Sequence, residues 1–292
     1  MSDPANKLPI GIFDSGVGGL TVYRALHDRL PNERFIYLGD TARVPYGTKS
    51  LATVERYAIE NSEFLASLGI KMLVVACNTA SALALPAIRA KIGIEVVGVI
   101  GPGGRRAVEV TSGRERPVIG VIATEATVSS GAYQAAIQRA SATAEVIQQG
   151  CPLFVPLAEE GWTREPETYS IAERYLARIR ESRPDALVLG CTHYPILRDV
   201  IQSTIGEDVQ LIDSGEATAD EVVALLAELG LADPDEVGGS RRLCDDLDHF
   251  FVTDAAERFA NVAERFLGTT PSKLEAIEVY GLDQVKGGSV IK

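Results

Sequence analysis

The feature that most constrains the fold of this chain is an internal repeat of strand-like segments. Ile10-Gly11-Ile12 recurs as Ile119-Gly120-Val121, and Val74-Val75-Ala76-Cys77-Asn78-Thr79 recurs as Val188-Leu189-Gly190-Cys191-Thr192-His193. Gly39 with Pro45 recurs in the same order as Gly150 with Pro156. Strand–loop–helix units resemble one another in general, but a repeat that keeps its order favours duplication of a whole lobe.

Short β-branched runs alternate with amphipathic helical stretches through most of the sequence. Apolar residues at helical spacing predict one helix over residues 51–68, where Gly69 can cap the end, and another over 167–180. This alternation indicates an α/β fold with mainly parallel sheets. We therefore predict two similar parallel-sheet lobes related by duplication, with the active site in the cleft between them. The predicted strands are residues 10–13, 35–38, 72–76, 96–100, 118–123, 146–148, 186–189 and 209–212.

The last 80 or so residues contain no third copy of the repeat and are expected to pack back on the first lobe. The predicted domains are residues 1–99 with 212–292, and residues 100–211. Within the return segment we expect a loop at 232–240, a solvated charged loop at 241–248, a strand at 249–253 and a helix at 255–267. A partly ordered tail is expected over 269–292.

Charge and composition restrict the possible partners. The net charge of −12 argues against non-specific binding to nucleic acid by counterion release. The first six residues lack the pattern of a signal peptide, and the uncharged stretch at 72–88 has a polar centre that would be costly in lipid. The four cysteines form no C-x-x-C pair and no zinc-ligand spacing, so neither metal nor disulfide framework is expected. We predict a cytoplasmic protein with reduced thiols.

Cys77 and Cys191 stand at equivalent ends of two repeated strands, where parallel sheets bind ligands. Each precedes residues that can start a helix, and the helix N-terminus is expected to lower the thiol pKa from about 8.5. Two thiols on opposite sides of a cleft could form a redox switch. They could also invert a carbon stereocentre, one removing a proton and the other returning one to the opposite face. The second interpretation accounts better for the polar residues around both cysteines.

Other polar residues follow the same strand ends. The loop at 14–19, Asp14-Ser15-Gly16-Val17-Gly18-Gly19, resembles a phosphate loop only loosely, since no Gly-Lys-Ser/Thr follows. Asp14 is expected to bind an ammonium group or hold a general base, with a helix N-cap as the alternative. His193 is expected to bind a substrate carboxylate or protonate Cys191. Weaker candidates from their local sequence alone are Tyr46, Gly47 and Glu159.

These motifs resemble those of the glutamate racemase family. The resemblance rests on residues 12–22, on Asp40-Thr41-Ala42-Arg43-Val44-Pro45-Tyr46-Gly47, on Ala76-Cys77-Asn78-Thr79-Ala80-Ser81 and on Leu189-Gly190-Cys191-Thr192-His193-Tyr194-Pro195. It covers roughly residues 8–267. It implies two α/β lobes with the active site between them, and cofactor-independent interconversion of L- and D-glutamate that supplies D-glutamate for peptidoglycan.

By this resemblance, Cys77 and Cys191 are the two acid/base residues, and Asp14, Glu159 and His193 assist them. The substrate contacts that the resemblance implies are Asp14, Ser15, Tyr46, Gly47, Asn78, Thr79, Thr124, Thr192 and His193. No metal or other cofactor is implied. The expected partner is glutamate itself, with a homodimer as the candidate assembly and neither nucleic acid nor membrane involved.

Two alternatives stay open at this stage. An aspartate racemase of the same superfamily would use the same cysteine pair, because pocket depth cannot be derived from spacing. A two-lobed amino-acid-binding regulator would need neither sulfur. A pyridoxal-phosphate racemase is disfavoured, because no lysine sits in a motif that marks a Schiff-base residue.

Overall fold

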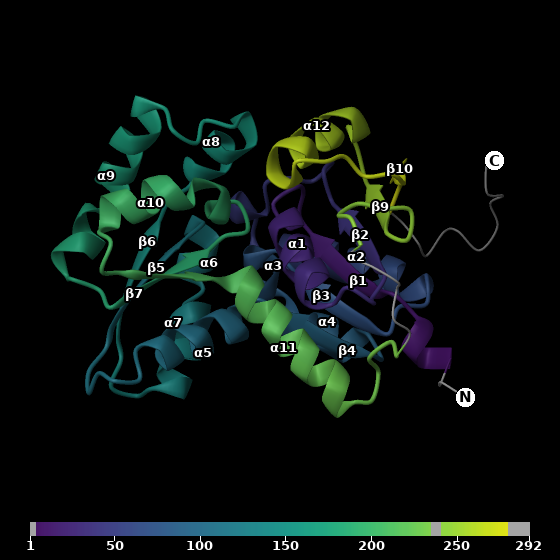
Figure 1. Ribbon diagram of the computed structural model, residues 1–292, viewed down its shortest axis with the longest axis horizontal. Helices are drawn as coiled ribbons and strands as arrows, with labels where there is room; N and C mark the ends of the chain where they lie inside the picture. Colours follow the sequence, from purple (N-terminus) through teal and green to yellow (C-terminus); the bar gives the residue numbers. More distant parts are fainter. Residues whose placement is uncertain (1–3, 235–240, 280–292) are drawn as a thin grey trace.

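The chain folds into two α/β lobes that lie side by side (Figure 1). The computed structural model describes residues 4–234 and 241–279. Each lobe is built on one sheet in which every strand pair is parallel. The α/β fold class and the two parallel-sheet lobes predicted from the sequence are confirmed.

The first sheet has six strands in the order β10-β9-β2-β1-β3-β4, and the second has four in the order β6-β5-β7-β8. Strands β2-β1-β3-β4 therefore repeat the order of β6-β5-β7-β8, which is consistent with duplication. The strands are β1 (Ile10–Asp14), β2 (Phe35–Gly39), β3 (Met72–Val75), β4 (Glu95–Gly98), β5 (Val118–Ala123), β6 (Glu145–Gly150), β7 (Ala186–Gly190), β8 (Gln210–Asp213), β9 (His249–Val252) and β10 (Leu274–Ala276).

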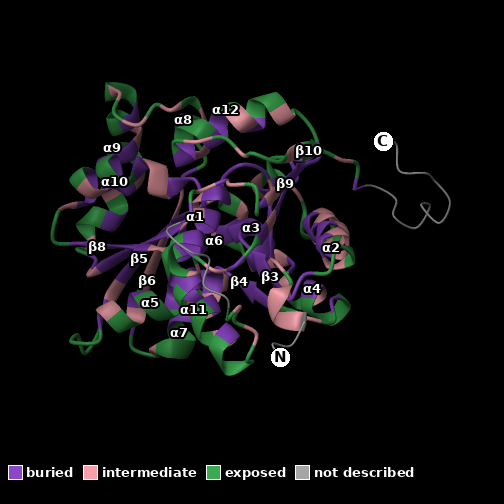
Figure 2. Cartoon of the chain, turned by 45° about the vertical axis from the view of Figure 1, so that its right-hand side comes forward, coloured by how far each residue is buried: buried purple, intermediate pink, exposed green. Residues whose placement is uncertain are grey.

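Helices cover the sheets, and their outer faces carry most of the exposed residues, while the strands are largely buried (Figure 2). Central strands β1 and β7 are buried along their whole length, because helices cover both faces of a parallel sheet. The helices are α1 (Leu20–Arg29), α2 (Leu51–Ser67), α3 (Asn78–Leu83), α4 (Leu85–Lys91), α5 (Ile100–Val110), α6 (Glu125–Ser129), α7 (Ala132–Ala140), α8 (Phe154–Glu160), α9 (Pro166–Glu181), α10 (Arg198–Ile205), α11 (Ser214–Glu228) and α12 (Ala256–Leu267), with short 3₁₀ turns η1 (Pro4–Lys7), η2 (Tyr46–Thr48) and η3 (Tyr194–Leu197).

Helix α2 illustrates how local sequence sets an element's ends. Ser50 caps its start by accepting the backbone N–H of Thr53. The chain leaves the helix at Gly69, whose φ of 76° lies in the left-handed region that glycine tolerates best. The predicted helix over 51–68 is therefore confirmed to within one residue.

Two elements join the lobes. Helix α11 leaves the second sheet after β8 and packs on α1 of the first lobe and on α5 (Figure 1). The following return segment adds β9 beside β2 and places α12 over the junction between the lobes. The division of the chain into domains at 99/100 and 211/212 remains a prediction.

One expected strand needs correction, and part of the expected tail is ordered. The strand expected at 96–100 ends at Gly98, because Ile100 already begins α5. Part of the expected tail is a strand, since β10 pairs in parallel with β9 at the edge of the first sheet. Residues 280–292 of that tail, and residues 235–240 of the expected loop, lie outside the described residues.

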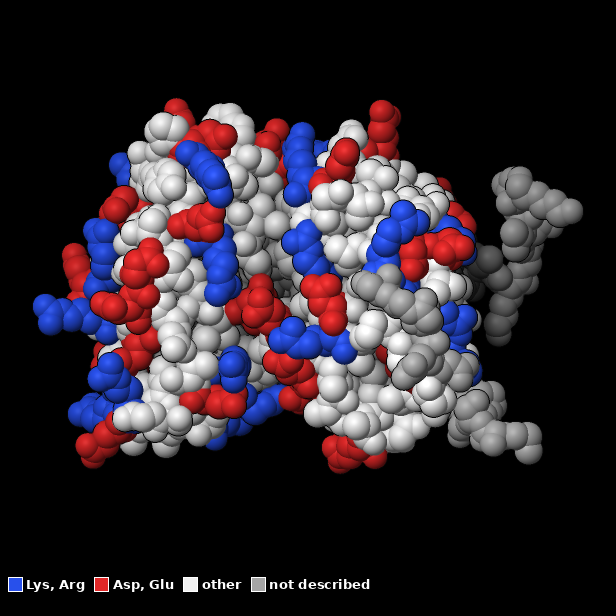
Figure 3. All heavy atoms as spheres, viewed as in Figure 1, with Lys and Arg blue, Asp and Glu red and all other residues white. Residues whose placement is uncertain are grey.

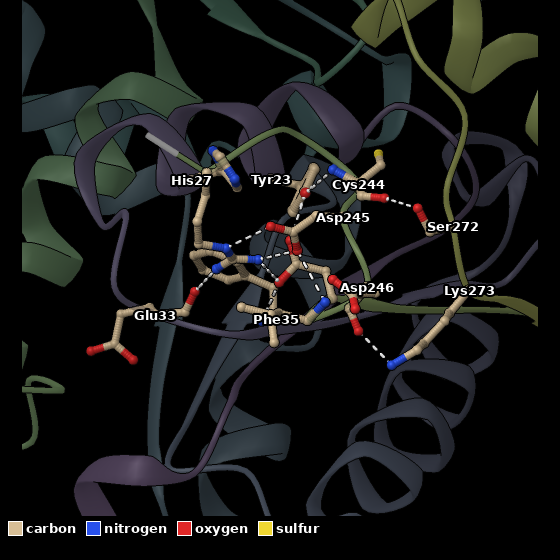
Figure 4. Close-up of polar contacts among 12 residues, drawn as sticks. Tyr23, His27, Glu33, Phe35, Cys244, Asp245, Asp246, Ser272 and Lys273 are labelled. Carbon is tan, nitrogen blue, oxygen red and sulfur yellow. Dashed lines mark hydrogen bonds and ion pairs between the residues drawn. The ribbon is translucent and has the colours of Figure 1, made fainter. Parts of the chain in front are cut away.

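The charged stretch 241–248 is not a solvated loop, contrary to expectation. Arg241 pairs with Asp245 at 2.7 Å and with Asp248 at 2.8 Å, and the side chains of Arg241 and Asp248 are 2% and 0% exposed. Figure 4 shows Asp245, Tyr23 and Phe35, which belong to the same network of polar contacts. Asp248 also accepts hydrogen bonds from Tyr23 Oη at 2.8 Å and from the backbone N–H of Phe35 at 2.9 Å. Opposite charges that are paired and hydrogen-bonded can be buried, whereas their sequence alone suggests exposure.

Candidate active site

The carboxyl ends of the central strands of both sheets face a small cavity of about 70 Å³. It adjoins a second cavity of about 100 Å³, with which it shares Gly16, Val17, Val44 and Glu159. Both are far smaller than the roughly 300–1,000 Å³ of a drug-sized ligand site, so they suit a small molecule. Of the site residues expected from the sequence, those that line the first cavity are Ser15, Tyr46, Gly47, Cys77, Asn78, Thr79, Thr124, Glu159, Cys191, Thr192 and His193.

A larger depression lies elsewhere. It has a volume of about 690 Å³ and is lined by residues such as Arg114, Arg180 and Asp208, at the end of the second sheet opposite to the cysteines. Neither Cys77 nor Cys191 lines it. The chemistry-bearing residues are therefore gathered in the smaller cavity between the lobes, not in this larger depression.

Cys77 comes from the first lobe, two residues after the end of β3, and caps the start of α3. Its Sγ accepts the backbone N–H of Ala80 at 3.4 Å and donates to Ser15 Oγ at 3.4 Å. Burial raises the pKa of the Cys77 thiol to about 12, and the nearby Asp14 carboxylate adds to the rise. The expectation of a lowered pKa at this cysteine is therefore wrong, because desolvation outweighs the hydrogen bonds of the sulfur with Ala80 and Ser15.

Cys191 comes from the second lobe, directly after β7, and its surroundings differ. Its Sγ lies 3.7 Å from His193 Nδ1, and His193 Nε2 lies 3.1 Å from Glu159 Oε1. Burial disfavours the imidazolium, but Cys191 and Glu159 stabilise it more strongly and raise the pKa of His193 to about 10. The two sulfurs thus face unlike groups, a carboxylate at Cys77 and an imidazolium at Cys191.

Asp14 lies at the end of β1 behind the cavity and is 1% exposed. Its Oδ2 accepts the N–H of Gly16 at 2.9 Å, within the loop and before α1 begins. Helix α1 has no side-chain cap, so Asp14 is not its N-cap. Burial raises the pKa of Asp14, which the positive charge of His193 partly opposes. Asp14 Oδ1 and Asn78 Oδ1 are both buried without a hydrogen-bond partner among the described residues. Two such acceptors could bind an ammonium group.

Hydroxyl groups from the two lobes meet on one side of the cavity. Thr79 Oγ1 lies 3.0 Å from Thr124 Oγ1 and 3.3 Å from Thr127 Oγ1. The hydroxyl of Tyr46 donates to Asp40 and accepts from Asn61 Nδ2 at 3.0 Å. Both hydrogen bonds are made within the first lobe, so this hydroxyl is already engaged. These hydroxyls form a polar wall that spans the junction.

The glycine-rich loop after β1 allows the two lobes to come very close together. A Cβ at Gly18 would lie 2.2 Å from Thr192 Oγ1 and 2.4 Å from His193 Nδ1. Nearby, Thr21 Oγ1 of α1 donates to the carbonyl of Thr192 at 2.8 Å. Only glycine leaves room for this close approach of His193. The contact accounts for a glycine in this loop without any need for a bound phosphate.

We expect Gly18→Ala to lower the turnover number at least tenfold, because the new methyl group pushes His193 away from Cys191. Gly93→Ala is the matched control, since a Cβ at Gly93 meets nothing within 4 Å. Steady-state rates of the two variants, with circular dichroism to check folding, test this. Equal rates in both variants would contradict the assigned role of Gly18.

Sequence reasoning missed several residues that support the site. Tyr133 Oη accepts from Asn78 Nδ2 at 2.8 Å and lies 2.7 Å from Ser214 Oγ, holding Asn78 from the second lobe. Arg258 of α12 lies 3.3 Å from Glu159 Oε2. Neither residue stands in a motif or at a repeated strand end, so no signal in the sequence marks it.

The described part of the chain offers neither a cluster of metal ligands nor a membrane-spanning helix. Within residues 4–234 and 241–279, no group of three or more His, Cys, Asp or Glu side chains is arranged to hold a metal ion. Among the described helices, none combines the length and apolar character needed to cross a bilayer. All four cysteines are free thiols and buried.

Comparison with known proteins places this geometry in a family. Residues 10–222 match the model of the Asp/Glu/Hydantoin racemase family. A glutamate racemase of Geobacter metallireducens is 54% identical over 260 residues, which cover 89% of this chain and 92% of that protein. A glutamate racemase of Chlorobaculum tepidum is 48% identical over 278 residues, covering 94% and 96% respectively.

A solved structure agrees with the fold as well as the sequence. The crystal structure of glutamate racemase from Francisella tularensis in complex with D-glutamate has a TM-score of 0.84 at 37% identity. The match covers 94% of this chain and 99% of that one. Such coverage includes both lobes and the cavity between them.

Proposed function

Because this chain belongs to the Asp/Glu/Hydantoin racemase family, we propose that it interconverts L- and D-glutamate by proton transfer between Cα and two cysteines. Glutamate racemisation is supported by relatives that match nearly the whole chain. The observation that carries the two-cysteine mechanism is the pair Cys77 and Cys191, which follow equivalent strands and line one cavity from opposite lobes.

In the proposed reaction, Cys191 removes the α-proton of L-glutamate and Cys77 returns one to the other face. Buried Cys77 has a raised pKa, so it holds a proton and is ready to act as the acid. For D-glutamate the roles reverse. The substrate ammonium then brings positive charge beside Cys77, which favours its thiolate. His193 supplies or takes up a proton at the Cys191 side, and Glu159 holds its imidazolium.

Substrate recognition is proposed for the polar groups around the sulfurs. Asp14 and Asn78 offer the ammonium group buried oxygens that have no hydrogen-bond partner within residues 4–234 and 241–279. The two carboxylates of the substrate would bind to hydroxyl and backbone groups. The residues that would provide these groups are Ser15, Tyr46, Gly47, Thr79, Thr124 and Thr192. An acidic protein can bind an anionic amino acid, because N–H and O–H donors at the site are sufficient to hold its carboxylates.

The test is circular dichroism of the purified protein, dialysed against EDTA, with L-glutamate and then L-aspartate and no added pyridoxal phosphate. We expect the signal of L-glutamate to decay to zero and that of L-aspartate to change at least tenfold more slowly. Faster loss with aspartate would favour an aspartate racemase. Binding without any decay would favour a regulator, and a need for either cofactor would overturn the mechanism.

The cellular setting is proposed on the same basis. A D-glutamate-forming enzyme would supply peptidoglycan synthesis and so support cell-wall formation and cell shape. We propose a cytoplasmic location and a homodimer as the assembly, with no nucleic acid or membrane partner.

A further inference from the structure

Helix α12 belongs in sequence to the return segment of the first lobe, yet it contacts α8 of the second lobe. In Figure 1 it lies above the junction, opposite the end of α8. Arg258 Nη2 lies 3.3 Å from Glu159 Oε2, and Arg265 Nη1 donates to the Glu159 carbonyl oxygen at 2.5 Å. The side chain and the backbone of one glutamate are thus both held by α12. Figure 3 shows charged side chains of both signs along the rims of the hollow between the lobes.

The same helix also contacts His193, the partner of Glu159. The ring of Phe266 meets the imidazole edge-to-face, with centroids 5.9 Å apart and planes at 88°. Phe266 is 2% exposed, so this contact is part of the core. Three residues of α12 therefore touch the pair His193–Glu159, which lies next to Cys191.

Glu159 needs such support because its own lobe holds its side chain through His193, the residue that Glu159 itself must orient. It is the next-to-last residue of the seven-residue helix α8, and its side chain is 24% exposed. Among the described residues, the side chain of Glu159 pairs with His193 and Arg258. Without the arginine, water would compete for the carboxylate, and its rotamers would no longer be fixed.

We propose that Arg258 and Arg265 are positioning residues that hold Glu159 against His193, so that proton transfer at Cys191 depends on contact between the two lobes. The role rests on the proposed function, because it assumes that Cys191 is one of the two bases. It predicts an effect on one side of the reaction only. The hydrogen bonds of the Cys77 thiol go to Ser15 and Ala80, not to this helix, so proton transfer at Cys77 should be unaffected.

The first test uses glutamate analogues with a leaving group on Cβ, in each enantiomer. Elimination needs one sulfur only: it takes the Cα proton, the C–H electron pair forms the Cα=Cβ bond, and the leaving group departs. We expect Arg258→Gln with Arg265→Gln to slow elimination from the L-analogue about threefold to tenfold and leave the D-analogue unchanged. Equal losses with both enantiomers, or no loss, would overturn the proposal.

Two further variants test whether a positive charge beside Glu159 is sufficient and whether loss of any surface arginine slows the enzyme. Arg258→Lys, with Arg265 intact, keeps a cation at the Glu159 carboxylate and should retain elimination from the L-analogue better than Arg258→Gln does. Arg164→Gln is the matched control, since Arg164 forms an exposed ion pair with Asp199 at 2.9 Å in the second lobe, the lobe of Glu159. This variant should change neither elimination rate. If Arg258→Gln alone eliminates from the L-analogue as fast as the wild type while the double variant is slowed, Arg258 has no positioning role and that part of the proposal is wrong.

A second readout does not depend on activity. The three histidines are few enough to follow individually by NMR during a pH titration. The imidazole of His193 faces Cys191, Glu159 and Asp14. If Arg258 positions Glu159, the pKa of His193 falls in Arg258→Gln, because its carboxylate partner moves away. If Arg258 acts only through its own positive charge, that pKa rises, and the proposal is wrong.

These measurements also distinguish the two proposals. If the wild-type protein neither racemises glutamate nor eliminates from either analogue, the proposed function fails. The NMR titration would still report whether Arg258 holds the His193–Glu159 pair. If the wild type is active and only the arginine variants behave otherwise than expected, the positioning role fails alone.

Discussion

Cys77→Ser and Cys191→Ser each lose glutamate racemisation by roughly 10²–10⁴-fold or more, because an alcohol is a far poorer acid–base group here than a thiol. Racemisation alone cannot show which sulfur serves which enantiomer. L- and D-glutamate have equal free energies, so kcat/KM in the two directions must fall by the same factor. A reaction that needs one proton abstraction is therefore required.

Elimination from the β-substituted glutamate analogues is a reaction that needs one proton abstraction only. Cys77→Ser should keep elimination from the L-analogue and lose it with the D-analogue, and Cys191→Ser should do the reverse. Cys151→Ala is the control, since Cys151 is fully buried and lines neither of the two cavities at the site. Should both serine variants retain the same enantiomer, the sulfurs attack one face and the two-base mechanism is wrong.

The parts of the site predicted from the sequence share one property: they lie at repeated strand ends. Cys77 and Cys191 occupy equivalent places after β3 and β7, which pair with β1 and β5 in matching order. Parallel strands bring their carboxyl ends to one edge, so the pattern also predicts their gathering. Local spacing and topology suffice for such residues.

What the sequence did not reveal depends on contacts between distant segments. The raised pKa of Cys77 arises from burial and from Asp14, which stands 63 residues earlier in the chain. The approach of Gly18 to His193 joins the two lobes, and so does the contact of Arg258 with Glu159. No helical or strand periodicity encodes such pairs. The same limit explains why the stretch 241–248 was expected to be solvated.

The buried ion pairs of residues 241–248 should contribute strongly to the stability of the fold. We expect Asp248→Ala to lower the free energy of unfolding by about 3–5 kcal/mol, the range for breaking one side of a buried ion pair. The substitution leaves Arg241, 2% exposed, without one of its two carboxylate partners, and leaves the Tyr23 hydroxyl and the Phe35 N–H without their acceptor (Figure 4). Urea unfolding followed by fluorescence and by circular dichroism measures the change.

Two companion variants identify the cause of that loss. Asp248→Asn keeps the shape and one acceptor oxygen for Phe35 N–H but removes the charge, so its loss should be smaller than that of Asp248→Ala. Arg29→Ala breaks an exposed ion pair with Asp220, whose side chains are 45% and 55% exposed, and should cost less than about 1 kcal/mol. Because Asp248 ties the return segment to α1 and β2, and α12 follows on that segment, the alanine variant should also weaken the contact of Arg258 with Glu159. If Asp248→Ala were no more destabilised than Arg29→Ala, the buried cluster would not anchor the return segment, and α12 would be held by its own core contacts alone.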